Sequence, residues 1–143
     1  MSDAGLLRTE LCGLSLRTPL VLLSGCVGFG QEYTRVAGFS HRDVGMVVLK
    51  GTTLEPRLGN APHRLAETPG GMLNAIGLQN PGARAVVRDI LPRLDFSETL
   101  FAANVSGATV EEYAEVTRIF DDSPVAAITA MQQNASLRIQ IEG

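Results

Sequence analysis

Three polar residues lie at or near the ends of apolar runs, where they could form a binding site. Ser24 follows PLVLL, Lys50 follows GMVVL, and Asn104 lies within TLFAANVSG. Lys50 is the most informative of the three, because an ammonium after an apolar run loses hydration unless it meets an anion or a strong acceptor. We interpret the three residues as ligand contacts. The alternatives are a simple turn at Ser24, a backbone contact at Asn104 and a surface position for Lys50.

A second candidate for binding is the segment GMLNAIGLQNPG, residues 71–82. It mixes apolar residues with two asparagines, a glutamine and repeated glycines. That composition suits neither a helix nor an ordinary strand. We expect a wall of backbone and amide groups around a flat polar ligand; a surface loop without function is the alternative.

Other kinds of site find no support in the sequence. SGCVGFG lacks the G-x-G-x-x-G spacing, and Lys50 stands where an acidic residue would hold a ribose, so we reject a dinucleotide site. His41 and His63 each lack a second ligand three or four residues away, so we expect structural or surface roles and no metal site. Cys12 and Cys26 belong to different elements, and we expect reduced thiols.

The composition predicts one compact domain that binds small molecules or proteins. The chain has 143 residues, of which 45% are hydrophobic and 19% charged. Disordered chains have a lower hydrophobic and a higher charged fraction, so we expect this chain to fold. Its net charge of -3 and the lack of a Lys/Arg cluster argue against a nucleic-acid partner. No apolar run approaches the roughly 20 residues of a membrane span, and no signal peptide is recognisable, so we expect no membrane partner and a cytoplasmic location.

Four short apolar runs predict the strands of a parallel sheet. They cover residues 19–25, 45–51, 99–107 and 125–131. Each run is hydrophobic on successive residues, which is typical of strands covered on both faces. Because the carboxyl ends of parallel strands lie at one edge, the three polar residues should meet there.

Helical patterns alternate with these runs. Residues 83–94 repeat apolar side chains on one helical face after the turn Asn-Pro-Gly. A second helix should begin at Thr109, whose hydroxyl caps the backbone while Glu112 reaches back to it. A weaker helix is expected over residues 32–37. Strand–helix alternation predicts a parallel α/β architecture.

Two segments outside this alternation predict β-hairpins. Residues 9–18 alternate around a glycine, before the first core strand. Residues 64–76 contain the turn Pro-Gly-Gly, and they form an insertion after the second core strand. Long insertions between core elements commonly carry function.

These residues carry a family resemblance. The succession SGCVGFGQEY, LKGTTLEPRLGNAPHRLAETPGGMLNAIGLQNPG and ANVSG with VEEY resembles the amino-terminal part of class 1 dihydroorotate dehydrogenases, most closely the 1B type. The resemblance runs from about Leu6 to about Ile128, and KGTTLEPR joined to GMLNAIGLQNPG is its most specific part. It implies an FMN-dependent (β/α)8 barrel that oxidises dihydroorotate to orotate in pyrimidine biosynthesis.

The resemblance also implies particular contacts, carried over position by position. The FMN contacts are Ser24, Lys50, Gly51 and Asn104. The orotate contacts are Lys50, Asn74, Ala75, Ile76, Gly77 and Leu78. A cation near the flavin stabilises the charge that appears on reduction, an asparagine offers a donor and an acceptor, and a glycine admits close backbone approach.

The resemblance fails at the position of the catalytic base. After VAAI the family continues with Glu-Leu-Asn, one residue, and Ser-Cys-Pro-Asn, in which the asparagine contacts flavin and substrate and the cysteine is the general base. In register, Met131 and Asn134 occupy the asparagine and cysteine positions, and neither can do the same work. Cys12 and Cys26 lie outside the motif, and Cys26 is expected to pack near the flavin edge. We therefore assign no catalytic residue.

The expected fold is the amino-terminal half of a (β/α)8 barrel, as a single incomplete domain over residues 1–143 with a divergent tail over 129–143. A closed barrel needs eight strands and typically about 250 residues. We therefore expect a truncated chain that is inactive alone and associates with itself. The resemblance further implies an electron-transfer subunit with FAD and an iron–sulfur cluster. The alternatives are a related flavin barrel acting on another pyrimidine, and a non-enzymatic half-barrel that binds a partner.

Overall fold

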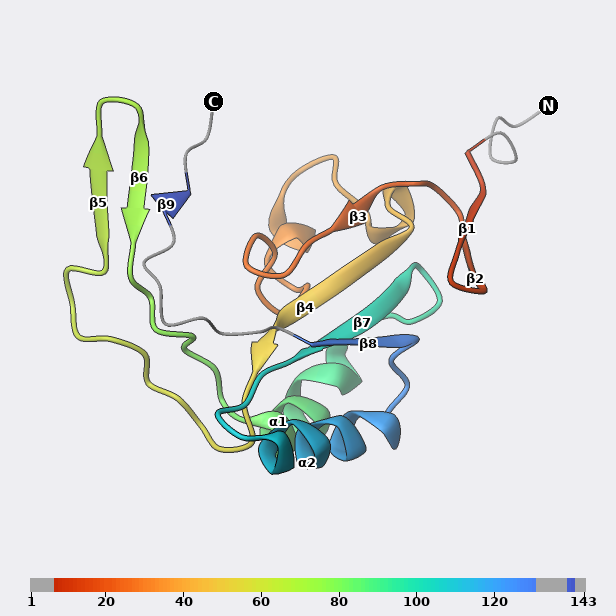
Figure 1. Ribbon diagram of the computed structural model, residues 1–143. Coiled ribbons are helices and arrows are strands. Elements are labelled where there is room, and N and C mark those ends of the chain that lie inside the picture. The colour runs from red at the N-terminus through yellow and green to blue at the C-terminus, as the bar shows by residue number, and fades with distance from the viewer. Residues whose placement is uncertain (1–6, 131–138, 141–143) are drawn as a thin grey trace.

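A four-stranded parallel sheet forms the centre of the chain (Figure 1). The computed structural model describes residues 7–130 and 139–140. The strands are β3 (Val21–Leu22), β4 (Met46–Thr52), β7 (Leu100–Val105) and β8 (Ala127–Ala130), in the spatial order β3-β4-β7-β8. All three pairings are parallel. The predicted parallel sheet is therefore confirmed, with each strand inside its expected apolar run or within one residue of it.

The two faces of the sheet belong to two separate apolar clusters. Because side chains alternate along a strand, Val47 and Phe101 lie on one face while Met46 and Ala102 lie on the other. The first face packs against the helical segments of residues 83–93 and 110–121, which lie together beneath the sheet in Figure 1. The second face packs against Leu16. Covering on both faces explains why these strands are hydrophobic at successive positions.

The amino-terminal strands pair with each other. β1 (Thr9–Leu11) and β2 (Leu14–Leu16) are antiparallel, and Cys12 and Gly13 form the turn with positive φ. Leu16 is only 2% exposed and anchors the end of β2 to the sheet.

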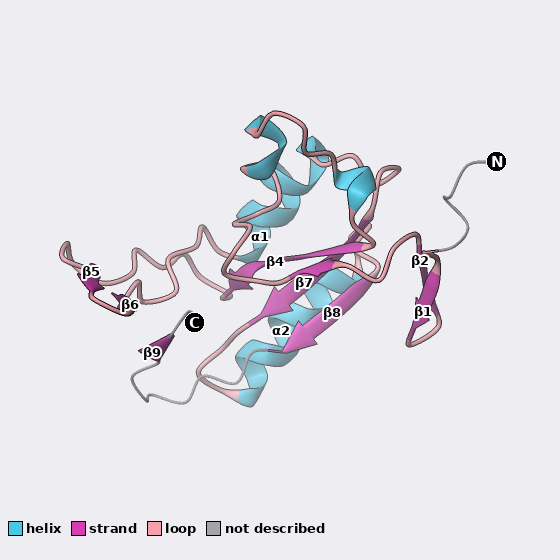
Figure 2. Cartoon of the chain, turned by 90° about the horizontal axis from the view of Figure 1, so that it is seen from above, coloured by secondary structure: helices cyan, strands magenta, loops and turns pink. Residues whose placement is uncertain are grey.

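The inserted strands project beyond the sheet. β5 (Leu65–Thr68) and β6 (Gly71–Asn74) pair antiparallel. Figures 1 and 2 show them extending from the side at which β4 ends. β9 (Ile139–Gln140) pairs with β6 on the side away from β5, which gives a place to part of the tail that the sequence pattern does not place.

The helix α2 (Val110–Asp121) begins as predicted. The Thr109 hydroxyl oxygen accepts a hydrogen bond from the Glu112 amide, and Val116 and Phe120 are buried against the sheet. One detail differs, because the Glu112 carboxylate accepts from the amide of Ala108 at 2.6 Å rather than from Thr109.

The helix expected over residues 83–94 is irregular. It consists of α1 (Ala83–Ala85), a π-helical turn at Val86–Ile90 and a 3-10 turn at Leu91–Arg93. Pro92 supplies the physical reason, since in a regular α-helix its ring clashes with the carbonyl four residues earlier and it has no amide to donate.

The prediction of a helix over residues 32–37 is wrong. Only a 3-10 turn, Tyr33–Arg35, forms there, and all of its residues are exposed. A helix without a buried face lacks the packing that stabilises short helices. In the described part of the chain, no helix has the length and apolarity that a bilayer crossing needs.

Candidate functional site

Lys50 lies inside β4, where the pairing with β7 changes register. Val48 is opposite Ala102 and Gly51 is opposite Asn104, so two residues of β4 face one residue of β7. Such a β-bulge commonly redirects a side chain beside a binding site. The sequence pattern predicts Lys50 at the end of its strand. The strand instead continues to Thr52, and Lys50 lies at a bulge within it.

Backbone hydrogen bonds hold Lys50 on both sides. Its amide donates to the Gly28 carbonyl at 2.7 Å, which brings the glycine-rich loop after β3 against β4. Its carbonyl accepts from the buried Thr52 hydroxyl at 2.9 Å. The side chain is half-buried, and no hydrogen bond or ion pair joins its ammonium to any other residue of the described ranges. The position of the lysine is thus fixed while its charge stays available.

Asn104 lies directly beside Gly51 across the β4–β7 pairing. It is 7% exposed, and among the described residues its Oδ1 atom has no hydrogen-bond partner. Leaving a buried amide oxygen unpaired costs about 1–3 kcal/mol. Gly51 is buried as well and places no side chain over the neighbouring surface. A ligand that donates a hydrogen bond at this edge would satisfy the amide oxygen.

Ser24 completes the set at the same edge of the sheet. It lies in the turn that follows β3 and is half-buried. Because β3 runs parallel to β4, with Leu22 opposite Val47, the turn emerges on the carboxyl side of the sheet. The structure therefore gathers Ser24, Lys50, Gly51 and Asn104 at one edge of three neighbouring strands.

The expected orotate segment follows β6. Asn74 is the last residue of that strand and is exposed, as is Ala75, while Ile76, Gly77 and Leu78 are half-buried. The Ala75 amide donates to the Arg64 carbonyl at 2.7 Å. The segment lies on the side of the sheet at which β4 ends (Figure 1). It therefore shares a side of the molecule with Lys50 but belongs to the projecting insertion rather than to the sheet.

Gly77 lies close to the backbone of Asn60, whereas the sequence predicts that it lies close to a ligand. Its φ of +76° favours glycine, and a Cβ atom there would lie 2.7 Å from the Asn60 amide nitrogen. The expected reason for this glycine is contact with a ligand. The structure supplies a second reason within the chain, namely contact with Asn60.

Two asparagines that the sequence pattern leaves unassigned hold this segment. Asn60 donates to the carbonyls of Ala75 and Ile76, and buried Asn80 donates to the carbonyl of Leu78. The only sequence signal for either is the turn Asn-Pro-Gly at Asn80. No periodicity reveals a residue whose role is set by contacts between two loops.

The cysteines and histidines do not add a second site. Cys12 and Cys26 are free thiols, and both are exposed. The expected packing of Cys26 near the flavin edge stays a prediction. His41 is buried and stacks edge-to-face on Phe101, which confirms a structural role. Residues 7–130 and 139–140 contain no group of three or more acidic, cysteine or histidine side chains that could hold a metal ion. Met131 and Asn134 lie outside the described residues.

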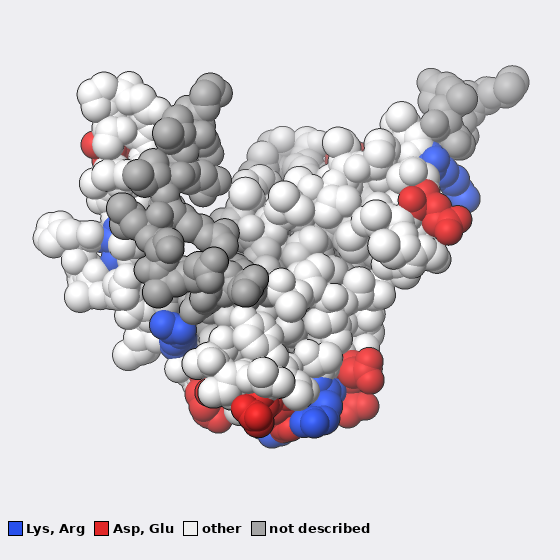
Figure 3. All heavy atoms as spheres, in the orientation of Figure 1, with Lys and Arg blue, Asp and Glu red and all other residues white. Residues whose placement is uncertain are grey.

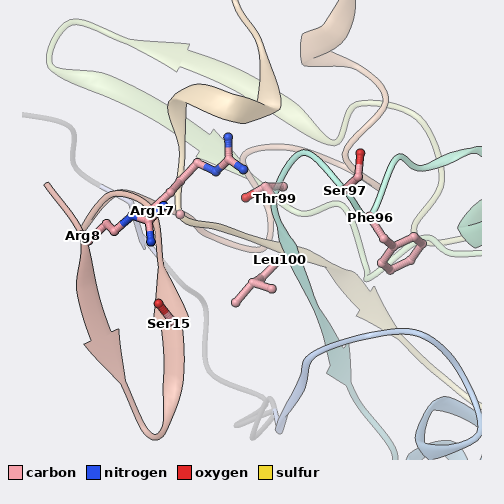
Figure 4. A pocket seen from close by; sticks show the side chains of 8 residues that line it. Arg8, Ser15, Arg17, Phe96, Ser97, Thr99 and Leu100 are labelled. Carbon is pink, nitrogen blue, oxygen red and sulfur yellow. The ribbon is translucent and has the colours of Figure 1, made fainter. Parts of the chain in front are cut away.

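A hollow of about 200 Å³ lies at the opposite edge of the sheet (Figure 4). Gly45 and Leu100, at the amino ends of β4 and β7, line it together with Arg8 and Arg17 from the β1–β2 hairpin. It contains none of the expected ligand contacts. Parallel α/β proteins bind their ligands at the carboxyl ends of the strands, so this hollow is not the candidate site.

Charged side chains gather away from the visible face of the sheet. In Figure 3 acidic and basic residues cluster over α2 and over the amino-terminal hairpin, while the middle of the view is white. The cluster at α2 contains the ion pairs of Glu115 with Arg84 and Arg118. Glu115 is therefore paired with two arginines, whereas no ion pair joins Lys50 to another residue of the described ranges.

These features define the class of protein. Parallel strands connected through helices, with glycines and polar side chains at their carboxyl edge, are typical of α/β proteins that bind ligands at that edge. A model of the family described as dihydroorotate dehydrogenase matches residues 6–136. The chain belongs to this family, and the resemblance found in its motifs is confirmed.

Individual relatives agree with this assignment. The chain is 48% identical over 130 residues to the catalytic subunit of dihydroorotate dehydrogenase B (NAD(+)) from Geobacillus kaustophilus, and 50% identical over 123 residues to the subunit of the same name from Listeria welshimeri. These matches cover 91% and 85% of this chain. The chain spans 40% of the length of either relative.

A solved structure supports the fold. Dihydroorotate dehydrogenase from Eimeria tenella, crystallised with ferulenol, matches with a TM-score of 0.59 at 18% identity. The match covers 90% of this chain and 37% of that protein.

Proposed function

We propose that the chain forms the amino-terminal half of a (β/α)8 barrel whose function is the FMN-dependent oxidation of dihydroorotate to orotate in pyrimidine biosynthesis. Family membership supports the reaction. The four parallel strands equal half of the eight in such a barrel. Within this proposal, residues 1–143 are a single domain of the half-barrel, and 129–143 are its divergent tail.

The observation that carries the flavin proposal is the unpaired Oδ1 atom of Asn104. It lies beside the buried Gly51, one residue from a lysine whose ammonium has no anionic partner in the described ranges. The oxidised flavin ring offers one N–H donor between two carbonyl acceptors along one edge. An amide oxygen, an ammonium and an open glycine surface fit such an edge, and Ser24 adds a hydroxyl from the next strand.

When bound, FMN supplies the hydride acceptor for the oxidation. Lys50 would place its positive charge beside the ring and stabilise the negative charge that follows hydride uptake. Asn104 would accept a hydrogen bond and orient the ring against Gly51. Both tasks require a fixed backbone beneath the side chain, which the bulge and the hydrogen bonds of the Lys50 amide and carbonyl support.

The substrate would lie against the segment Asn74–Leu78. Asn74 would donate and accept hydrogen bonds with the ring amide groups of dihydroorotate, and Lys50 would meet its carboxylate. The proposal assigns no proton-abstracting base, because Asn134 occupies the position of the family's cysteine. We therefore expect ligand binding by this chain without turnover of dihydroorotate.

A protein partner follows from the names of the relatives. They are catalytic subunits of an NAD(+)-dependent enzyme, which implies a second subunit that passes electrons to NAD. We propose that this partner carries FAD and an iron–sulfur cluster.

The test is an FMN titration of the 143-residue chain, followed by flavin absorbance. We expect saturable binding that Lys50→Ala weakens by about tenfold or more, because a hydrogen bond to a charged group contributes about 1.5–3 kcal/mol. Arg93→Ala removes the same charge from an exposed position and should bind FMN as the wild type does.

Lys50 is the only lysine in the sequence, which permits a second readout. Reductive methylation with carbon-13 formaldehyde labels this side chain and the chain terminus alone. FMN should shift the NMR signal of the labelled lysine. Absence of FMN binding, or equal binding by Lys50→Ala, would refute the proposed site.

A further inference from the structure

Asn80 is a buried asparagine between the sheet and the inserted loop. It is 5% exposed, and its side chain uses both of its polar atoms. Oδ1 accepts from the amides of Thr53 at 3.2 Å and Gly82 at 2.9 Å. Nδ2 donates to the Thr53 hydroxyl at 3.0 Å and to the Leu78 carbonyl at 2.9 Å.

These hydrogen bonds join the two parts of the proposed site. Thr53 follows β4 directly, three residues after Lys50, whereas Leu78 is the last residue of the proposed orotate segment. Backbone hydrogen bonds between Arg57 and Asn80, at 2.8 and 2.9 Å, join the same two loops. The Asn80 side chain therefore connects the end of the lysine strand to the end of the substrate segment.

Asn60 holds the middle of the same segment. Its amide donates to the Ile76 carbonyl at 3.0 Å, and its Nδ2 donates to the Ala75 carbonyl at 2.8 Å. Asn60 belongs to the loop that begins with Thr53. The orotate segment is therefore attached to that loop in its middle, through Asn60, and at its end, through Asn80. Of these two asparagines, Asn80 also bonds to Thr53, the residue that follows β4.

A simple turn does not explain this arrangement. An asparagine that only stabilises a turn accepts from the amide two residues later, as Oδ1 does from Gly82. The two bonds from Nδ2 lie outside the turn: one reaches Thr53, which follows the strand of Lys50, and the other reaches Leu78 in the proposed orotate segment.

We propose that Asn80 is a positioning residue that sets the orotate segment Asn74–Leu78 relative to β4 and Lys50. This inference rests on the proposed function for its substrate. Asn80 itself contacts neither ligand. It fixes the carbonyl of Leu78 and thereby the direction in which the preceding residues face the ligand.

Asn80→Asp is the most informative variant. The carboxylate keeps the acceptor for Thr53 and Gly82, but it loses the donor and repels the Leu78 carbonyl. Gln79→Ala is the matched control. It removes an exposed neighbouring amide whose Oε1 accepts a hydrogen bond from the Arg64 side chain. Thr53→Val, which removes the hydroxyl partner of Nδ2, replaces Asn80→Asp if that variant does not fold.

Two measurements on the full chain test the proposal. Amide hydrogen exchange should accelerate by about tenfold at Asn60 and Ala75, which do not bond to the Asn80 side chain, if their positions depend on it. Orotate affinity should fall by about tenfold, while FMN affinity changes by less than about threefold, because the FMN contacts lie on the sheet. Gln79→Ala should change neither. A purely structural role would lower both affinities together.

The outcomes separate the inference from the proposed function. Unchanged exchange at Asn60 and Ala75 would overturn the positioning role, whatever the ligand results. Faster exchange with unchanged orotate affinity would overturn its link to substrate. If the wild-type chain binds FMN but not orotate, the proposed substrate site fails, and the exchange rates alone decide whether Asn80 positions the segment.

Discussion

At the scale of residues, Asn104 fits the proposed ligand site better than it fits the stability of the unliganded fold. Its Oδ1 has no partner among the described residues, although its neighbours on β7 are fully buried apolar side chains. A valine or alanine would suit this strand better. An asparagine at such a position is disadvantageous for the unliganded fold and useful only where a ligand supplies the missing donor.

Asn104→Val should separate these two effects. Without FMN we expect the free energy of unfolding to rise by about 1 kcal/mol, because an unpaired buried acceptor is removed. FMN affinity should fall by about tenfold, since the ligand loses its acceptor. Urea unfolding and FMN titration measure the two quantities. A variant that is less stable and still binds FMN would contradict this account.

At the scale of elements, the bulge in β4 decides where Lys50 lies. The extra residue between Val48 and Gly51 interrupts the pairing at Lys50 itself, directly before Gly51. The Thr52 side chain is 0% exposed, and its hydroxyl donates to the Lys50 carbonyl within the interrupted stretch. We infer that this hydrogen bond stabilises the bulge.

Thr52→Val tests the bulge with little change in side-chain volume. We expect a loss of about 1 kcal/mol in unfolding free energy and weaker FMN binding, because the Lys50 carbonyl loses its donor. Thr52→Ser keeps the hydroxyl and should retain FMN affinity. Thermal unfolding with and without FMN provides the measurement. Equal FMN affinity in the valine and serine variants would show that the hydroxyl does not position Lys50.

At the scale of the whole molecule, the sheet is bounded by two outermost strands, each open along one side in the described part of the chain. Within the described residues β3 and β8 each have one neighbour, and eight strands are needed for a closed barrel. An unpaired strand edge is a template for pairing with another chain. The open sides of β3 and β8 therefore predict association through these strands.

We expect the chain to associate with itself as its concentration rises. A charge on an edge strand opposes such pairing, so Ala130→Lys on β8 should weaken association by about tenfold, or about 1.4 kcal/mol. Ala37→Lys adds the same charge at an exposed turn as a control. Analytical ultracentrifugation over a range of concentrations measures the effect. A constant mass equal to one chain would refute self-association.

The sequence by itself determined the parallel sheet, the start of α2 and the edge at which Ser24, Lys50, Gly51 and Asn104 gather. These features depend on local patterns: successive apolar residues, a capping threonine and the rule that parallel strands end at one edge. The motifs were also sufficient for the family.

Only the tertiary structure decided the bulge at Lys50, the π-helical turn before Pro92 and the roles of Asn60 and Asn80. Each depends on contacts between segments distant in the chain or on competing local geometries, such as the hydrogen bonds of Asn80 to Thr53. Periodicity reports which face of an element is buried, but it does not report which polar group of one loop meets the backbone of another. The position of the proposed substrate segment relative to the lysine strand is therefore a property of the folded chain.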